Sequence, residues 1–338
     1  MALVRRKFGA HLDAAAKTTL ASQRAYPSVA AMRNPLTRSI IRRVAEGDWL
    51  ATLDQIDFHY SMENISIGGV PCVSYRAQGA KADAPLILYL HGGGFVCGSA
   101  RVNASTVLPS CHLSGCEAIA VDYSLTPEAV YPTQLDEIEA VYRALLAGGR
   151  SADQIVVIGD SAGGALTLSS LYRWRAAGLS LPAGFVLLSP VLDSRAESDT
   201  HQTLRGRDPL FSANSAENCT QCFQLYAGDA DINDPLVSPL AGDPAGLPPA
   251  LLHAGTREVL LGDSARFSEK ARLAGVDVTL QVYDGMFHLF HQHWRLSQAK
   301  SAHRDIAEFI ARTTAASVGA IADMRPTIYP VEFARFGG

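Results

Sequence analysis

The sequence lacks the features that mark membrane, secreted and nucleic-acid-binding proteins. No run of about 18 apolar residues occurs among its 338 residues, which argues against a transmembrane helix. The N-terminal stretch carries basic side chains but no long apolar core or cleavage site, so we do not expect a secretory signal. The net charge is only −4 with both signs scattered, and no basic run forms a patch for nucleic acid or a membrane surface. We therefore expect a cytoplasmic protein with no nucleic-acid partner and no membrane span.

Cysteine is also sparse, and the spacing of the cysteines is only a weak signal for a metal site. In a cytosolic chain of this size we expect reduced thiols packed in the interior. Two cysteines near residue 220 have the spacing of a metal-ligand pair, but one such pair is a weak signal for zinc. We expect neither a bound metal nor a cofactor. The six cysteines are Cys72, Cys97, Cys111, Cys116, Cys219 and Cys222.

The hydrophobic residues that are present, 48% of the chain, form a pattern of alternating strands and helices. The order predicts an α/β fold, a mostly parallel sheet covered by helices on both faces. Before it, alternation over residues 55–76 around Gly68-Gly69 predicts an antiparallel hairpin at a sheet edge. The apolar runs that we read as further strands are 86–90, 118–121, 155–158, 185–188, 250–254 and 276–282, and the predicted helices are 102–114, 131–147, 263–274 and 297–312.

Two segments fall outside this alternation. Residues 2–50 carry helical signals, with one helix near residues 14–21 and a second over 29–44 that Asn34-Pro35 interrupts. About sixty residues separate the strands at 185–188 and 250–254, which is too long for an ordinary connection. We read this stretch, with a predicted helix at 214–226, as an insertion.

A candidate nucleophile lies in residues 159–163, which read GDSAG. A strand precedes this stretch and a helix follows it, so Ser161 would sit on a tight strand-to-helix turn, the nucleophile elbow. Side chains at Gly159 or Gly163 would collide with neighbouring backbone in such a turn. The helix also directs its N-terminal N–H groups and positive dipole end at the serine. The flanking elements make this match stronger than a chance GxSxG.

A glycine loop, His91-Gly92-Gly93-Gly94, follows the predicted strand at 86–90. Its glycines would let backbone N–H groups point into a cavity, as an oxyanion hole requires, and the N–H of Ala162 would complete it. The other interpretations are a phosphate-binding loop and a plain turn. A phosphate loop would be followed by Lys-Ser or Lys-Thr, whereas Phe95-Val96-Cys97 follows here.

Among ten histidines, His288 is the candidate general base. It follows the last predicted strand and the turn at 284–286, which places it at the same sheet edge as the serine. We expect His291 and His293 to lie on a solvated helix start. A metal site of these three is an alternative, but no carboxylate or cysteine cluster accompanies them.

Two carboxylates compete for the acid that orients the base. Glu258 lies in the loop after the strand at 250–254, and Asp263 follows where we expect an aspartate to cap the next helix. The order Ser161, Glu258, His288 is the serine–acid–histidine order of α/β-hydrolases. Each of the three follows a different predicted strand.

Taken together, the motifs resemble the hormone-sensitive-lipase-like family of α/β-hydrolases, the bacterial type IV carboxylesterases. The resemblance covers residues 50–312. It rests on HGGGF at 91–95, VDYSLTPE at 121–128 with Tyr131, Pro132 and Asp136, GDSAGG at 159–164, SPL at 238–240 before Pro248 and Pro249, and GMFH at 285–288.

The resemblance implies an α/β-hydrolase fold, whose eight-stranded sheet is roofed by a helical cap. The cap would consist of N-terminal helices in residues 1–50 and an insertion over 191–240. The catalytic domain would comprise 51–190 and 241–313, and 314–338 would be an irregular tail. The family also suggests a homodimer formed through the strand near 276–282.

Position by position, the resemblance implies Ser161 as nucleophile and His288 as base. It implies Gly93, Gly94 and Ala162 as oxyanion donors, and His91 as a residue that shapes the glycine loop. The chain departs from the common pattern at the acid, because most members with GDSAG carry an aspartate where this one has glutamate. We favour Glu258 over Asp263, and keep Asp160 and Asp263 as supporting or alternative acids.

These features predict a carboxylic ester hydrolase that acts on small-molecule esters with short-to-medium acyl chains through an acyl-enzyme. An amide or lactone hydrolase would use the same groups. A non-catalytic binding protein is a further alternative, since the plant gibberellin receptor resembles this family, but its kind has lost the histidine that His288 supplies here. Aromatic and thioether side chains that could line an acyl pocket or pack in the core are Phe95, Phe211, Phe223, Tyr226, Met286 and Phe287.

Overall fold

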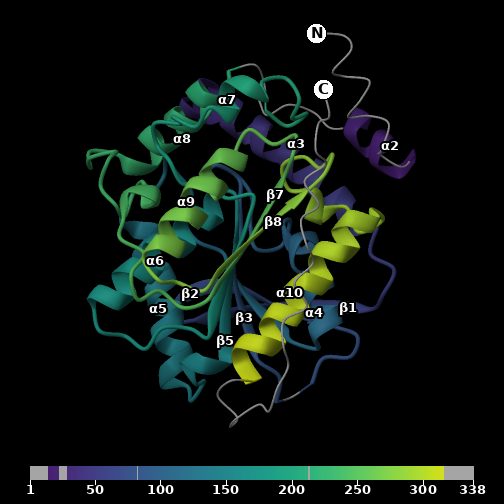
Figure 1. The fold of residues 1–338 in the computed structure, drawn as a ribbon, viewed down its shortest axis with the longest axis vertical. Coiled ribbons are helices and arrows are strands. Elements are labelled where there is room, and N and C mark those ends of the chain that lie inside the picture. Colours follow the sequence, from purple (N-terminus) through teal and green to yellow (C-terminus); the bar gives the residue numbers. More distant parts are fainter. Residues whose placement is uncertain (1–13, 23–28, 82, 212–213, 316–338) are drawn as a thin grey trace, which may run out of the picture.

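A central eight-stranded sheet carries helices on both of its faces (Figure 1). The structure is a computed structural model, and it describes residues 14–22, 29–81, 83–211 and 214–315. The predicted α/β class and the eight-stranded sheet are confirmed. The predicted irregular tail, 314–338, lies outside the described residues except for its first two, which end the last helix.

The strand order of the sheet is β1-β2-β4-β3-β5-β6-β7-β8. As predicted, β1 and β2 form an antiparallel hairpin at one edge. β2 also pairs antiparallel with β4, and all the other pairs are parallel. Every residue of β3, β5 and β6 is buried, which suits their apolar composition and their place at the centre of the sheet. The strands are β1 Tyr60–Ile67, β2 Val70–Ala77, β3 Leu86–Leu90, β4 Glu117–Val121, β5 Ile155–Asp160, β6 Gly184–Leu188, β7 Ala250–Gly255 and β8 Val278–Tyr283.

The alternation of side chains along the strands divides the core into two layers. Leu86, Leu88 and Leu90 pack in the layer formed by α5 (Thr133–Ala147), α6 (Ala162–Ala176) and α9 (Leu261–Leu273). Ile87 and Tyr89 pack on the opposite face in the layer formed by α4 (Leu108–Ser114) and α10 (Ser297–Ala315). Both faces of the sheet are therefore covered, as a parallel sheet requires.

Several helices gather at one end of the sheet (Figure 1). They come from the two segments that the sequence separates from the α/β alternation, the N-terminal region and the long insertion. These elements are α2 Ala14–Ser22, η1 Val29–Arg33, α3 Pro35–Leu53, α7 Thr200–Thr203 and α8 Ser215–Ala227. Four further short 3₁₀ turns are η2 Ala104–Thr106, η3 Ala152–Gln154, η4 Pro239–Ala241 and η5 Phe290–Gln292.

The expected interrupted helix over 29–44 is wrong in its boundaries. Asn34 caps a new helix, α3, because its side chain accepts hydrogen bonds from the N–H groups of Leu36 at 2.9 Å and Thr37 at 3.4 Å. Pro35 then occupies the first turn, where its missing N–H costs nothing and its fixed φ is already helical. The Asn-Pro pair is therefore the start of a helix that runs past residue 50, to Leu53.

Smaller differences lie at other element ends. The hairpin begins at Tyr60, later than the alternation from residue 55 suggests, and the helix predicted over 102–114 is divided into η2 and α4. The four-residue helix α7 was not predicted. None of the helices in the described ranges combines the length and the apolar composition that a bilayer crossing requires.

Candidate active site

Ser161 lies on the turn between β5 and α6 in a strained backbone conformation, with φ 49° and ψ −116°. Its N–H donates to the carbonyl of Leu188 at 2.9 Å, which ties the turn to the end of β6. A Cβ on Gly163 would stand 2.0 Å from the carbonyl oxygen of Leu90, so only glycine fits there. The turn thus holds the Ser161 hydroxyl above the carboxyl end of the sheet, with 8% of the residue exposed.

His288 lies in the loop after β8, and its side chain points at the serine. Its Nε2 is 3.0 Å from Ser161 Oγ, a distance at which a proton can pass between them. The ring of Phe211 meets the imidazole edge to face at a centroid distance of 4.9 Å. His288 is buried, so the imidazole is held between the serine and the aromatic ring.

Glu258 lies in the loop after β7 and is fully buried. One carboxylate oxygen is 3.5 Å from Nδ1 of His288, which is longer than an ordinary hydrogen bond. The other oxygen accepts from the Ser189 hydroxyl at 2.9 Å and from the Gly255 N–H at 2.8 Å. Catalytic hydrogen bonds are often long before substrate binds, so this spacing suits an acid that orients the imidazole.

Ser189 is a site residue that the sequence interpretation missed. Its hydroxyl donates to Glu258 and accepts from the N–H of Leu289 at 3.3 Å, so it joins the acid loop to the base loop. Ser189 directly follows β6 at the carboxyl edge of the sheet. The rule that selected Glu258 and His288, a polar residue after a parallel strand, would have found it.

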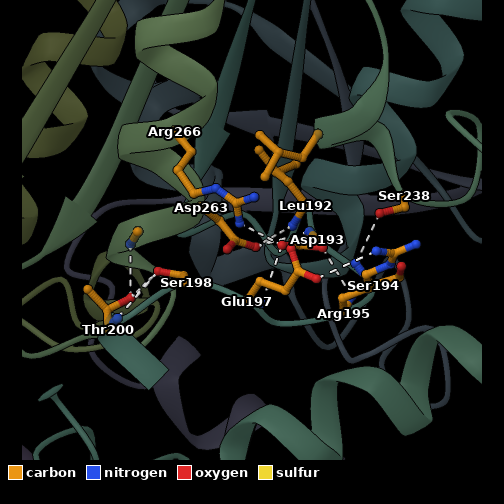
Figure 2. A network of polar contacts seen from close by, with 12 residues as sticks. Leu192, Asp193, Ser194, Arg195, Glu197, Ser198, Thr200, Ser238, Asp263 and Arg266 are labelled. Atoms are coloured by element: carbon orange, nitrogen blue, oxygen red, sulfur yellow. Dashed lines mark hydrogen bonds and ion pairs between the residues drawn. The ribbon is translucent and has the colours of Figure 1, made fainter. Parts of the chain in front are cut away.

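Asp263 does not cap its helix, contrary to expectation. The helix α9 begins at Leu261, and the side chain of Asp263 reaches across to the loop after β6 (Figure 2). It accepts hydrogen bonds from the N–H groups of Leu192 at 2.8 Å and Asp193 at 3.1 Å. Burial raises the pKa of this carboxyl to about 7. Asp263 therefore anchors that loop, where Asp193 also pairs with Arg266 at 2.6 Å.

Asp160, the other candidate acid, contacts the base of the glycine loop. Its Oδ1 accepts from the hydroxyl of Tyr89 at 2.6 Å and from the N–H of Gly92 at 2.9 Å. Burial raises the pKa of the Asp160 carboxyl to about 6. These contacts hold the glycine loop beside the elbow.

The glycine loop has a backbone conformation that only glycine adopts readily. Gly93 has φ 123°, and a Cβ there would stand 1.9 Å from the carbonyl oxygen of Cys97. In the described part of the chain, the N–H groups of Gly93 and Gly94 donate to no protein acceptor. The N–H of Ala162 opens α6, in the turn where helical N–H groups lack intrahelical partners. Gly93 and Gly94 line the same pocket as Ser161, and Ala162 is the next residue after Ser161 in the chain.

His91 stabilises the loop from behind. Its ring stacks on Tyr123 at a centroid distance of 4.2 Å, and its Nδ1–H donates to the carbonyl of Gly92 at 2.7 Å. The Tyr123 hydroxyl donates to the His91 carbonyl at 2.6 Å. Burial lowers the pKa of His91, which keeps the ring neutral.

An apolar pocket opens beside Ser161 and encloses about 780 Å³, its open mouth included. No charged side chain of the described residues lines it. The lining consists of Val29, Met32, Ile41, Ala45, Gly93, Gly94, Val96, Cys97, Ser161, Val191, Leu210, Phe211, Asn218, Cys219, Cys222 and Phe223.

The structure separates the six pocket candidates into three pairs. Phe211 and Phe223 line the pocket, whereas Phe95 and Tyr226 stack on each other at 4.3 Å in the core. Met286 and Phe287 pack in a separate cluster beneath α10.

The cysteines of the described chain are all free thiols, and three of them line this pocket. Burial raises the pKa of Cys97 and of Cys222 to about 12, so both are protonated and act as small apolar groups. Within the described ranges, no group of three or more histidine, cysteine or carboxylate side chains is arranged to hold a metal ion.

The expectation that His291 and His293 lie on a solvated helix start is wrong. Both are buried, because the 3₁₀ turn η5 packs under α10. His303 of α10 donates from Nε2 to the carbonyl of His291 at 3.0 Å, and its Nδ1 accepts from the Ser110 hydroxyl at 2.8 Å. His253 Nδ1 lies 3.3 Å from His291 Nε2. These histidines form a neutral packed cluster.

The chain is similar in sequence to a known protein family and to characterised hydrolases. A family model described as the α/β hydrolase fold matches residues 87–292. An esterase of Acinetobacter venetianus is 36% identical over 247 residues, which cover 72% of this chain and 80% of the relative. An acetyl-hydrolase of Streptomyces hygroscopicus is 32% identical over 244 residues, covering 72% and 81%.

Solved structures are similar over most of the chain. An esterase from the bacterial hormone-sensitive lipase family superposes with a TM-score of 0.77 at 33% identity, covering 85% of this chain and 96% of the other. EstE7, a hormone-sensitive-lipase homologue from a metagenome library, superposes with a TM-score of 0.74 at 34% identity, covering 80% and 92%.

The buried histidines predict a specific loss of stability in acid. Burial lowers the pKa of His303 to about 4, below the ordinary value of about 6.5 that it has in the unfolded chain. The unfolded chain therefore binds the proton first, and the contribution of a neutral His303 is present above about pH 6.5 and lost as the pH falls towards 4. His303→Gln has no such titration. Between pH 7 and pH 5 we expect the wild type to lose about 1–2 kcal/mol more unfolding free energy than this variant, measured by urea unfolding.

The comparison with the variant is needed because other buried groups also titrate. Asp160, Asp208 and Asp263 have raised pKa values, so their effect on stability has the opposite sign, but it is the same in both proteins. An equal loss of unfolding free energy in wild type and His303→Gln would contradict the prediction.

Proposed function

The chain belongs to the α/β-hydrolase fold family, among its hormone-sensitive-lipase-like esterases, and is a carboxylic ester hydrolase; we propose that Ser161, His288 and Glu258 form its catalytic triad. The observation that carries the proposal is the 3.0 Å approach of His288 Nε2 to Ser161 Oγ at an apolar pocket. Glu258 lies on the far side of the same imidazole.

In the first half of the proposed reaction, His288 Nε2 takes the proton of Ser161 as Oγ attacks the ester carbonyl carbon. The carbonyl π electrons move to oxygen, and the N–H groups of Gly93, Gly94 and Ala162 donate to this oxyanion. Glu258 stabilises the imidazolium through Nδ1. When the tetrahedral intermediate collapses, the C–O bond of the ester breaks and the imidazolium gives its proton to the leaving alcohol.

The second half repeats these steps with water. His288 takes a proton from the water molecule, whose oxygen attacks the acyl carbon of the acyl-enzyme. Collapse of the second intermediate releases the carboxylic acid, and Ser161 regains its proton. Only side chains, backbone N–H groups and water take part. The donors act where charge develops, so they lower the barrier more than they strengthen substrate binding.

We also propose that residues 1–50 and 191–240 form a cap over residues 51–190 and 241–313. The pocket wall supports this organisation, because η1 and α3 supply one side of it and the segment around α8 supplies another. Arg42 of α3 donates to the carbonyl of Val96 at 2.7 Å and pairs with Glu128 at 2.7 Å. These contacts tie the N-terminal helix to the end of the glycine loop.

The pocket supports a neutral, apolar acyl group as the part of the substrate that enters it. Its lining favours aliphatic chains, and we propose chains of short-to-medium length. A cytoplasmic location and a homodimer formed through β8, an edge strand of the sheet, complete the proposal.

Removing the nucleophile tests the proposal most directly. Ser161→Ala should lower kcat for p-nitrophenyl butyrate by at least about four orders of magnitude, because no acyl-enzyme can form. The melting temperature should stay at or above that of the wild type, since the strained turn is kept. Hydrolysis at a wild-type rate by a folded Ser161→Ala protein would refute the triad.

The acid is tested by two conservative substitutions. Glu258→Gln should lower kcat by about three to four orders of magnitude, because the amide no longer stabilises the imidazolium. Asp263→Asn weakens the hydrogen bonds that hold residues 192 and 193, so it should lower the melting temperature and leave kcat within about tenfold. A large loss of kcat in Asp263→Asn, together with a wild-type kcat in Glu258→Gln, would show that Asp263 is the acid of the triad.

The pocket wall predicts how acyl preference can be changed. We expect kcat/KM of the wild type to be highest for butyrate to octanoate esters and to fall towards dodecanoate. Met32→Ala removes buried side-chain volume from the wall and should move the optimum to longer chains. Ile40→Ala in the same N-terminal region is the matched control, because Ile40 is 65% exposed and does not line the pocket. An identical chain-length profile in wild type and Met32→Ala would contradict the assignment.

A further inference from the structure

A short segment of the insertion, residues 207–211, lies between the two loops that carry the proposed acid and base. The carbonyl of Arg207 accepts a hydrogen bond from the guanidinium of Arg257 at 3.0 Å, next to Glu258 in the acid loop. The ring of Phe211 lies edge to face with the imidazole of His288. Phe211 also lines the pocket. One segment therefore contacts the acid loop, the base and the substrate pocket.

Asp208 stands at the centre of this segment and is almost completely buried, with 2% exposed. Its two carboxylate oxygens have separate partners. Oδ1 accepts from the N–H of Leu210 at 2.9 Å, which closes a tight turn within the segment. Oδ2 accepts from the backbone N–H of His288 at 3.2 Å. The carboxylate thus joins the insertion directly to the backbone of the proposed general base.

A buried carboxylate is costly unless its oxygens are paired, and these two N–H groups supply the pairing. Its position next to His288 also gives it an electrostatic role. A negative charge close to an imidazole favours the protonated form, which is the form that His288 adopts in the transition state. Glu258 stabilises the same imidazolium through Nδ1, while the carboxylate of Asp208 lies at the backbone N–H of His288.

From this geometry we infer that Asp208 is a positioning residue for the esterase reaction: its carboxylate fixes the backbone of His288, orients the imidazole towards Ser161 and stabilises the imidazolium. The inference rests on the proposed triad. Because Leu210 and Phe211 of the same turn form the pocket wall, the carboxylate also fixes the wall relative to the base.

The protonation state of Asp208 should make the rate of ester hydrolysis depend on pH. Burial raises the pKa of its carboxyl to about 6, the neighbouring charge of Glu258 raises it further, and His288 lowers it. Below that pH the carboxyl is protonated, and it no longer carries the negative charge that stabilises the imidazolium. Asp208 should therefore contribute to the acid limb of the pH profile.

The chain contains a matched control in a second turn of the same insertion. Residues 207–210 read RDPL and residues 233–236 read NDPL. Oδ1 of Asp234 accepts from the N–H of Leu236 at 2.8 Å, the same turn contact that Asp208 makes with Leu210. Asp234 is half-buried, and its hydrogen bonds within the described structure stay among residues 231–238. It shares the turn but has no bond to the base loop.

The experiment compares Asp208→Asn with Asp234→Asn, using p-nitrophenyl butyrate and counting active sites with an organophosphate that labels Ser161. An asparagine at 208 has one acceptor oxygen, so its NH₂ group must face one of the two N–H groups. We expect kcat per labelled site to fall about 100-fold with KM within about threefold, because the base is displaced and the pocket remains. Asp234→Asn should keep the wild-type kcat and KM.

The pH profile separates positioning from mere structural support. A negative charge beside the imidazole stabilises its protonated form, so the acid limb of kcat/KM in Asp208→Asn should move to lower pH by about 0.5–1 unit when that charge is removed. A purely structural role would lower the rate without moving this limb. Wild-type kcat or an unmoved acid limb in Asp208→Asn would overturn the inference.

Two further variants keep the result interpretable. Where Asp208→Asn does not fold, Asp208→Glu takes its place: it keeps the charge but displaces the loop, so kcat should fall while the acid limb stays at the wild-type pH. A wild-type kcat in Asp208→Glu would overturn the inference. Ser161→Ala separates a failure of the Asp208 inference from a failure of the triad. If Ser161→Ala is inactive, the triad stands even when the Asp208 variants behave like the wild type. If Ser161→Ala is active, both the triad and the role of Asp208 are overturned.

Discussion

The site depends on the close approach of α6 to the end of β3. The first turn of α6 passes so near the backbone of Leu90 and His91 that residue 163 must be glycine. This approach sets the strained Ser161 beside the glycine loop, and Gly93 and Gly94 line the same pocket as Ser161. Stabilisation of an oxyanion requires donors fixed before the reaction, and backbone packing supplies that rigidity.

Buried carboxylates then fix the loops around this turn, and each one has a different partner. Asp160 binds the N–H of Gly92 below the glycine loop, and Asp263 binds the loop after β6. Glu258 binds Ser189 and Gly255 and approaches His288, whose backbone N–H is bound by Asp208. A buried acid is stable only where such donors surround it, so these four positions mark where the carboxyl edge of the sheet is held rigid.

The elements above the sheet complete the site in a different way. Their contribution to the pocket is apolar, from residues such as Met32, Ile41 and Phe223. An apolar wall removes water from the reacting ester, which strengthens the interactions of the charged groups beneath it. The hydrogen bond from Arg42 to the Val96 carbonyl joins α3 to the end of the glycine loop. The N-terminal helix α3 and this loop are thus packed together.

The amino-acid sequence by itself determined the class of the fold, most element positions, and the residues that lie on turns directly after strands, Ser161, His288 and Glu258 among them. These properties follow from the spacing of apolar residues and glycines within short stretches of the chain, because that spacing determines the local backbone structure. Only the tertiary structure decided which carboxylate faces the imidazole, because Glu258, Asp263 and Asp160 occupy similar local contexts but meet partners far away in the chain. It also decided that His291 and His293 are buried, and that Asn34-Pro35 starts a helix. The roles of Ser189 and Asp208 arise from contacts that span 69 and 80 residues. The position of Ser189 directly after a strand could have singled it out, whereas no such pattern marks Asp208.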